Sequence, residues 1–211
     1  APSLGITTSR ENVGEVENHG FEFQTRVIPI KNKDWEWSLS LNYAYNKNKI
    51  KKISNALREQ NEKNQAKGGV TPLPIYEEGQ SLTALKVVSS AGIDPITGNE
   101  VFIKRDGSLT FVYDPNDKVV YGDTTPFGMG SIGSYLTYKQ FSMGMSMRYS
   151  FGGAVYNQTL ASKVEGADPR YNADERVFSS RWKEVGQQAK YKRISDSSVP
   201  MQTSRFVETN N

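Results

Sequence analysis

The stretch FSMGMSMRYSFG, from Phe141 to Gly152, decides the fold. Large apolar side chains occupy every second position, namely Phe141, Met143, Met145, Met147, Tyr149 and Phe151. A period of two predicts a β-strand with one apolar face. Twelve residues at about 3.3 Å each, tilted by about 45°, rise roughly 28 Å, which is close to the thickness of a bilayer core. Because the second face is small and polar, as beside a water-filled lumen, the stretch predicts a transmembrane barrel strand.

Three more segments show the same alternation. Together with the first stretch they predict long strands near residues 21–30, 35–48, 128–138 and 141–152. Short polar turns at residues 31–34 and 139–140 join them into two hairpins. The predicted fold is therefore all-β, with about four long antiparallel strands of a transmembrane β-barrel.

The connections between the hairpins differ sharply in length. Both hairpin turns are very short, whereas the links at residues 53–125 and 153–211 are several dozen residues long. Outer-membrane barrels have short periplasmic turns and long extracellular loops, so this asymmetry predicts that the long links are extracellular. Aromatic residues near both ends of the strands fit two interfacial girdles. An antiparallel soluble sheet with a one-sided core remains the open alternative.

Composition excludes several kinds of protein. The chain has 211 residues, 36% of them hydrophobic, a mean hydropathy of −0.62 and no long apolar run, which excludes a transmembrane helix but not a transmembrane barrel. There is no cysteine and one histidine, His19, so disulfides and zinc sites are not expected. The first residues lack the features of a signal peptide, so the chain is expected to be either unexported or an internal piece.

Chemical motifs are weak throughout the chain. Residues 128–133 spell G-x-G-x-x-G, but no helical pattern follows, so these glycines are expected to ease strand curvature or close approach. No catalytic, cofactor or metal site is predicted, and the protein is not expected to be an enzyme. A basic cluster, Lys47, Lys49, Lys51 and Lys52, would emerge just past Tyr43 and Tyr45 at the outer rim, where lipopolysaccharide phosphates are the nearest anions. A solvated face is the common alternative, and nucleic acid is not an expected partner.

The long link at residues 53–125 holds the candidate binding residues. A small hairpin is expected around Asp106-Gly107, and Asp94 begins a tight turn. The flat aromatic faces on which a sugar ring can stack belong to Tyr76, Phe102, Tyr113 and Tyr121. The carboxylates that can accept hydrogen bonds from sugar hydroxyls belong to Asp94, Glu100 and Asp106. For Phe102 and Tyr113, packing within the loop itself is the stronger expectation. On the strand from Phe141, the predicted lipid-facing residues are Phe141, Met143, Met145, Met147 and Tyr149.

Several of these segments also resemble a known family. The resemblance is carried by residues 11–23, Trp35-Glu36-Trp37-Ser38, residues 41–50, Ala91-Gly92-Ile93-Asp94-Pro95 with Thr97-Gly98, Tyr121-Gly122-Asp123-Thr124-Thr125-Pro126 and Tyr149-Ser150-Phe151-Gly152-Gly153. The combination is similar to the C-terminal barrel of SusC/RagA-type TonB-linked outer-membrane proteins. It covers nearly the whole chain. The chain departs from the family's pattern in having no plug domain, no TonB-contacting segment and too few strands to close a barrel, so a fragment is expected.

The resemblance implies a TonB-dependent importer in the outer membrane of a Gram-negative bacterium. The expected substrates are oligosaccharides or peptides, and the expected partners are a SusD-like surface lipoprotein over the loops and the TonB complex, reached through the missing N-terminal part. Membrane lipid or lipopolysaccharide would surround the barrel. A soluble β-rich module that binds carbohydrate or protein is the alternative, and a surface glycan hydrolase is a weaker third possibility.

Overall fold

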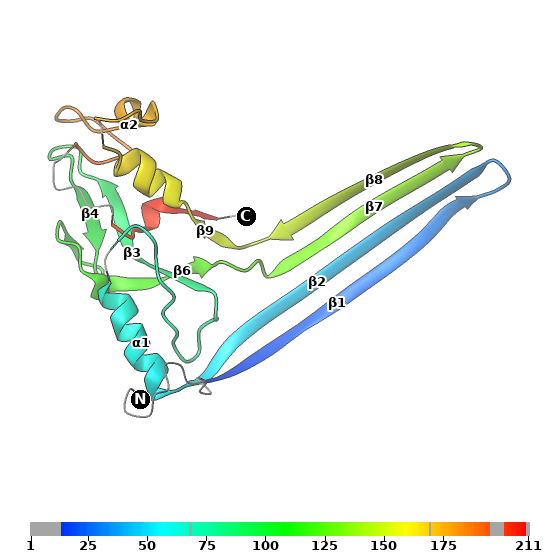
Figure 1. The fold of residues 1–211 in the computed structure, drawn as a ribbon, viewed down its shortest axis with the longest axis horizontal. Helices are drawn as coiled ribbons and strands as arrows, with labels where there is room; N and C mark the ends of the chain where they lie inside the picture. The colour runs from blue at the N-terminus through cyan, green and yellow to red at the C-terminus, as the bar shows by residue number, and fades with distance from the viewer. Residues whose placement is uncertain (1–13, 68, 169, 195–200, 210–211) are drawn as a thin grey trace, which may run out of the picture.

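The computed structural model describes residues 14–67, 69–168, 170–194 and 201–209. Its longest elements form one antiparallel sheet in the order β1-β2-β7-β8. The bounds are Gly14–Lys31 for β1, Trp35–Ile53 for β2, Gly128–Tyr138 for β7 and Phe141–Phe151 for β8. Figure 1 shows this sheet as a long arm that projects from the rest of the molecule. The all-β antiparallel prediction is confirmed, although the described strands do not close into a barrel.

The two short turns close the hairpins at the far end of the arm. In the β1–β2 turn the Asn32 side-chain oxygen accepts from the amides of Asp34 and Trp35, at 3.0 and 2.8 Å. In the β7–β8 turn Lys139 has φ of 53°, a left-handed conformation, and its amide donates to the Asp34 carbonyl at 2.8 Å. The two turns are thus tied to each other.

The first strand is longer than the sequence pattern indicates. Strand β1 begins at Gly14, and its ladder with β2 continues to Ile53, although residues 14–20 show no apolar alternation. Residues 1–13, which include residues 11–13 of the segment that carried the family resemblance, lie outside the described residues. Pairing with β2 therefore extends β1 past the residues in which apolar and polar side chains alternate.

The remaining described residues within 54–127 and 152–209 form a second body, which we call the loop lobe. It contains a sheet in the order β5-β4-β3-β6 and a two-stranded sheet of β9 and β10. Its elements are β3 (Ala84–Ile93), β4 (Glu100–Ile103), β5 (Leu109–Thr110), β6 (Lys118–Asp123), β9 (Ala154–Tyr156), β10 (Val207–Thr209), helices α1 (Asn55–Ala66) and α2 (Arg176–Ser179), a π-helix (Leu160–Glu165) and two 3-10 turns (Pro115–Asp117 and Ser204–Phe206). No helix in the described ranges is long and apolar enough to cross a membrane.

Helix α1 was not predicted, because its twelve residues are almost entirely polar. Its start is set by Ser54, whose hydroxyl accepts from the Leu57 amide at 3.2 Å. Asn61 then fixes the helix to the following segment, since its side-chain amide bonds both the N–H and the carbonyl of Tyr76. The expected hairpin around Asp106-Gly107 is confirmed by the pairing of β4 with β5.

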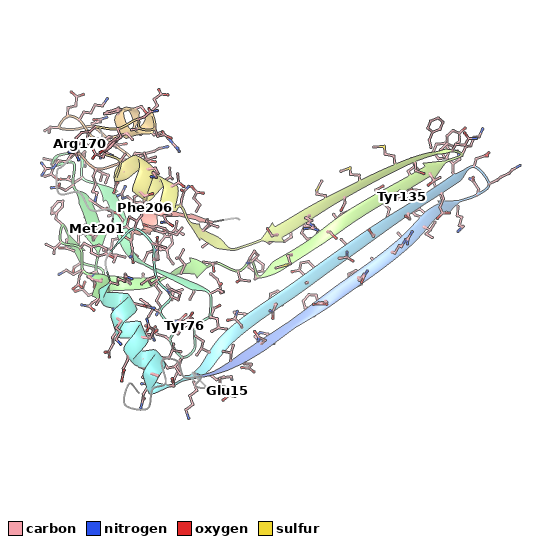
Figure 2. The ribbon with its side chains drawn as sticks, viewed as in Figure 1. Glu15, Tyr76, Tyr135, Arg170, Met201 and Phe206 are labelled. Atoms are coloured by element: carbon pink, nitrogen blue, oxygen red, sulfur yellow. The ribbon has the colours of Figure 1, made fainter. Side chains whose placement is uncertain are left out.

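The buried core lies in the loop lobe. One cluster joins Ala161, Val164, Val177, Tyr191 and Phe206, and a second joins Leu85, Val87 and Ala154. Figure 2 shows side chains packed densely in the lobe and standing free along both faces of the arm. The lobe therefore has an interior of its own, whereas Ile50, at the end of β2 that contacts the lobe, is the one buried apolar side chain of the four-stranded sheet among the described residues.

Candidate functional site: two faces of the sheet and the loop lobe

The strand register gives the sheet one apolar face. Residues directly opposite in an antiparallel pair point to the same side. Met143 lies opposite Leu136, which lies opposite Trp37, and Met147 lies opposite Ile132, which lies opposite Leu41. On β8 the exposed fractions are 78% for Phe141, 70% for Met143, 57% for Met145 and 51% for Met147, whereas Tyr149 is partly buried. The five predicted lipid-facing residues thus share one broad, exposed apolar face.

Aromatic rings gather at both ends of this face. At the turn end the rings of Trp35 and Tyr138 are 4.2 Å apart. At the end nearer the lobe, the ring centroid of Phe21 lies 5.6 Å from that of Tyr43 and 5.8 Å from that of Tyr45. Aromatic side chains at the two borders of an apolar band are typical of transmembrane barrels.

Glycines in β7 make room for the side chains of Tyr149 and Tyr43. A Cβ at Gly130 would lie 2.5 Å from the Tyr149 hydroxyl oxygen, and that hydroxyl donates to the Asn42 carbonyl at 2.9 Å. A Cβ at Gly128 would lie 2.8 Å from the Tyr43 hydroxyl. The G-x-G-x-x-G segment therefore serves close approach within a sheet, as expected from the absence of a following helix.

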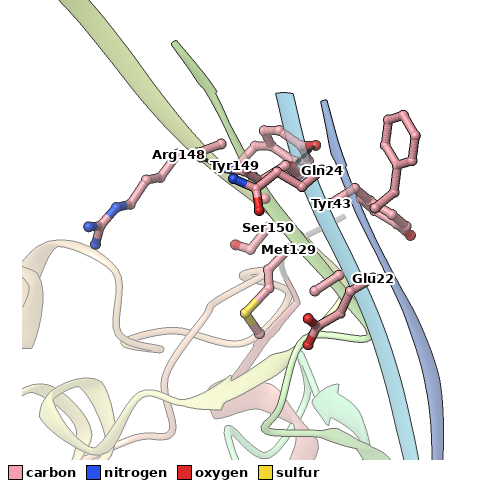
Figure 3. Close-up of a pocket in the computed structure, with 12 residues that line it drawn as sticks. Glu22, Gln24, Tyr43, Met129, Arg148, Tyr149 and Ser150 are labelled. Atoms are coloured by element: carbon pink, nitrogen blue, oxygen red, sulfur yellow. Dashed lines mark hydrogen bonds between the residues drawn. The ribbon is translucent and has the colours of Figure 1, made fainter. Parts of the chain in front are cut away.

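The opposite face is polar and hollowed. A hollow of about 720 Å³ lies over it, and residues abreast on the four strands, Gln24, Asn42, Ser131 and Arg148, form its floor. The Asn42 side chain donates to the Ser131 hydroxyl at 3.0 Å. In Figure 3 Arg148 extends away from the strands on this side. A second hollow of about 480 Å³ continues along the same face past Ser40 and Ser146.

Three of the predicted binding residues take part in the interior of the lobe. Glu100 is 2% exposed, and both its carboxylate oxygens accept from Arg205, at 2.7 and 2.8 Å. Phe102 is 4% exposed and meets the Tyr113 ring edge-on at 5.5 Å. Burial raises the pKa of Tyr113 to about 12. Glu100 and Phe102 are therefore not presented to a ligand, and for Phe102 and Tyr113 packing within the loop is confirmed.

The other four candidates lie nearer the surface. Asp94 and Asp106 stabilise turns: Asp94 accepts from Thr97, and Asp106 accepts from the amide and hydroxyl of Ser108. These hydrogen bonds, led by the Thr97 hydroxyl for Asp94 and the Ser108 hydroxyl for Asp106, lower the pKa of each carboxyl group. Tyr76 is partly buried beside α1, and Tyr121 on β6 is 46% exposed. Tyr121 thus offers the most open aromatic ring of the predicted set.

A buried ionic cluster in the lobe had no signal in the sequence. Arg205 also donates to both oxygens of Glu165, at 2.8 and 2.7 Å, and Lys192 lies 3.4 Å from Glu165. Burial opposes the charge of Arg205, but the hydrogen bonds and charges of Glu100 and Glu165 outweigh it and raise the arginine's pKa. Arg181 closes the cluster by donating to the carbonyls of Val164 and Glu165. These residues come from segments far apart in the chain, so no local pattern could reveal them.

The chain is similar to known outer-membrane receptors. It is 30% identical over 182 residues to TonB-dependent receptor P3 of Formosa agariphila, covering 77% of this chain and 18% of that protein. It is 30% identical over 162 residues to TonB-dependent receptor SusC of Bacteroides thetaiotaomicron, covering 73% of this chain and 16% of that protein. The resemblance to SusC/RagA-type TonB-dependent receptors is thereby confirmed. No protein-family model matches the chain.

Solved structures agree on the fold. The structure of the RagAB peptide transporter matches with a TM-score of 0.75 at 20% identity, covering 99% of this chain and 23% of that chain. A second RagAB structure, in the "closed-closed" state, matches with a TM-score of 0.68 at the same identity. The chain spans less than a fifth of the length of the curated SusC-type relatives it matches. These relatives are named as receptors and transporters, in line with the expectation that the protein is not an enzyme.

Proposed function

We propose that this chain forms part of the barrel wall and outer loops of a TonB-dependent nutrient importer in the outer membrane of a Gram-negative bacterium. The observation that carries the proposal is the exposed apolar face of β1, β2, β7 and β8, bordered by aromatic rings and backed by a polar face. In water such a face would promote association, whereas in a bilayer it is solvated by lipid. The similarity to SusC-type receptors supports the same function.

In this proposal the polar face lines the lumen. Arg148 would be costly in hydrocarbon, and only the lumenal assignment keeps it in a polar environment. The strands adjoining β1 and β8, the plug and the TonB-contacting part would belong to the rest of the protein. The substrate would be an oligosaccharide or a peptide, and a SusD-like surface lipoprotein would lie over the loop lobe. The fold similarity to the RagAB peptide transporter supports an importer of this kind.

A pair of arginine substitutions in the complete protein tests the wall assignment. Met145→Arg places a charge on the apolar face, and we expect it to reduce the stability of the protein folded in the membrane by about 2–4 kcal/mol near the midplane. Ser146→Arg, its neighbour on the polar face, is the matched control and should cost much less. Equal losses at the two positions in reversible unfolding from lipid vesicles would reject the assignment.

We also propose that residues 53–125 contact substrate or partner. Deleting Gly92 to Tyr113 would remove Glu100 and Phe102 and so damage the lobe itself. A sharper test is Tyr121→Ala, since Tyr121 is exposed, with Tyr171→Ala as the control because Tyr171 is 75% exposed outside that segment. Growth on oligosaccharides or peptides as the carbon source should fall with Tyr121→Ala alone. Unchanged growth with the Tyr121 variant would remove this residue from the proposed contact surface.

A further inference from the structure

The ladder of β1 with β2 continues after the four-stranded sheet has ended. Strand β7 pairs with β2 as far as Tyr45 opposite Gly128, whereas β1 and β2 remain paired from Gly20 opposite Asn46 to Gly14 opposite Ile53. We call residues 14–20 and 46–53 the ribbon. In Figure 1 it runs from the sheet toward the start of α1. The ribbon therefore lies just beyond the aromatic border formed by Phe21, Tyr43 and Tyr45.

One face of the ribbon is covered by the loop lobe. The Asn48 side-chain oxygen accepts from the Ser81 hydroxyl at 3.0 Å and from the Leu82 amide at 2.7 Å. Ile50 is 2% exposed, and its amide donates to the Gln80 carbonyl at 2.8 Å. The side chains that alternate with Asn48 and Ile50 consequently lie on the other face of the ribbon, where a Cβ added at Gly79 would lie 3.9 Å from the Lys49 Cε.

The uncovered face carries three lysines in succession, Lys47, Lys49 and Lys51, which we call the lysine band. The band continues the alternation of Tyr43 and Tyr45, so it lies on the same side as the apolar face. Lys47 is directly opposite His19 and Lys49 directly opposite Glu17, while the Lys51 ammonium lies 2.7 Å from the Glu17 carboxylate. All three lysines are exposed.

The charges on this face do not balance. Glu15 and Lys52 lie opposite each other on the same face, so four ammonium groups face the two carboxylates of Glu15 and Glu17, and two positive charges remain with His19 neutral. Glu17 is engaged by Lys51, which leaves Lys47 and Lys49 to bind other anions. Lys47 is two residues beyond Tyr45, a distance of about 6.6 Å along a strand. Because an interfacial aromatic ring sits at headgroup level, a side chain one step farther out lies among the polar headgroups.

We propose that the lysine band binds the phosphate groups of anionic lipid headgroups on the outer surface of the membrane. The inference rests on the proposed function, since it requires that the apolar face contacts lipid. A compact ammonium with three donors suits a phosphate, and a long flexible stem lets it reach one while its methylenes cover apolar surface. The covered face of the ribbon orients the lysines, because it holds the strand pair against the lobe.

The test uses the complete protein in detergent, titrated with diphosphorylated lipid A and followed by native mass spectrometry. Lys47→Gln combined with Lys49→Gln should weaken lipid A binding by about thirtyfold, since each lysine near an anionic surface contributes on the order of 1 kcal/mol and about 1.4 kcal/mol is a factor of ten. The matched control is Lys31→Gln, at the end of β1, combined with Lys33→Gln in the β1–β2 turn, at the opposite end of the sheet. This control should leave binding unchanged. Lipid A lacking phosphate and inorganic phosphate alone should bind weakly to the unaltered protein.

Three results would overturn the inference: unchanged lipid A binding in the Lys47 and Lys49 variant, an equal loss in the Lys31 and Lys33 control, or equal binding of lipid A without phosphate. The arginine pair at Met145 and Ser146 separates this failure from failure of the proposed function. If Met145→Arg is costly and lipid A binding is unchanged, only the lysine band is wrongly assigned. If both arginine variants are equally tolerated, the wall assignment itself is wrong.

Discussion

Met143 in the sheet is 70% exposed, whereas Val87 in the loop lobe is completely buried. The two residues are similarly apolar, so the difference lies in what surrounds them. The lobe buries its apolar side chains against its own elements, as a soluble domain does. The sheet leaves a whole apolar face uncovered, which fits a surface solvated by lipid. One chain thus contains a body that supplies its own interior and a sheet that depends on its environment.

The largest expected effect breaks the interior of the lobe. Glu165→Gln removes a carboxylate that is 1% exposed and leaves Arg205 and Lys192 short of countercharge. We expect a loss of about 3–5 kcal/mol in lobe stability, because breaking a buried ion pair strands its partners. Hydrogen exchange in the complete protein would show faster exchange in the lobe and unchanged exchange in β7 and β8.

Its matched control is Asp168→Asn. Asp168 pairs with Arg170, but that arginine side chain is 82% exposed, so the pair is screened by water. Exchange in the lobe should stay the same. If the sheet loses protection together with the lobe in the Glu165 variant, the two regions do not have separate sources of stability.

A smaller effect is expected at a glycine of the lobe. Gly98 has φ of 69°, and an added Cβ would lie 2.5 Å from the Trp182 ring. Gly98→Ala should therefore cost about 1–3 kcal/mol from backbone strain and overlap together. Gly107→Ala is the control, since Gly107 has φ of 84° but open space around it, and it should cost about 1 kcal/mol. Equal losses in the free energy of unfolding for the two variants, measured by chemical denaturation, would show that the Trp182 ring moves aside without cost.

The smallest expected effect is a dependence on alkaline pH. Burial raises the pKa of Tyr113 to about 12 from an ordinary value of about 10, so the folded lobe favours the neutral phenol. The stability from this burial is fully present below pH ~10 and is lost as the pH rises toward ~12. Lobe stability should fall over this window in the unaltered protein and less in Tyr113→Phe. Identical pH profiles for the two proteins would contradict the burial of this hydroxyl.

The sheet could be predicted from sequence because its signal is local. Alternation at Trp35, Leu39 and Leu41 or at Met143 and Met145 directly reports a strand with one apolar face. The extension of β1 from Gly14 to Gly20 could not be predicted, since its side chains alternate no apolar surface and its pairing depends on β2. A strand segment that forms because a neighbouring strand pairs with it need not show apolar alternation in its own sequence.

The lobe was less predictable for a different reason. Its stability depends on contacts between distant segments, such as Arg205 with Glu100 and Glu165. Glu100 therefore looked like a surface acceptor in the sequence, although the structure buries it in an ion pair. The polar floor at Asn42, Ser131 and Arg148 was partly predictable, because alternation fixes which residues share a face but not that they enclose a hollow.

The most direct test of the two-faced sheet uses the absence of cysteine from the chain. Single cysteines at Met143, Met145 and Met147 and at Ser142 and Ser146 would be introduced into a cysteine-free form of the complete protein in lipid vesicles. We expect the three methionine positions to react with a lipid-soluble maleimide and to resist a charged one, and the two serine positions to show the reverse preference. Reactivity that does not alternate along β8, or equal access of the charged reagent to both faces, would contradict the assignment of the apolar face to lipid.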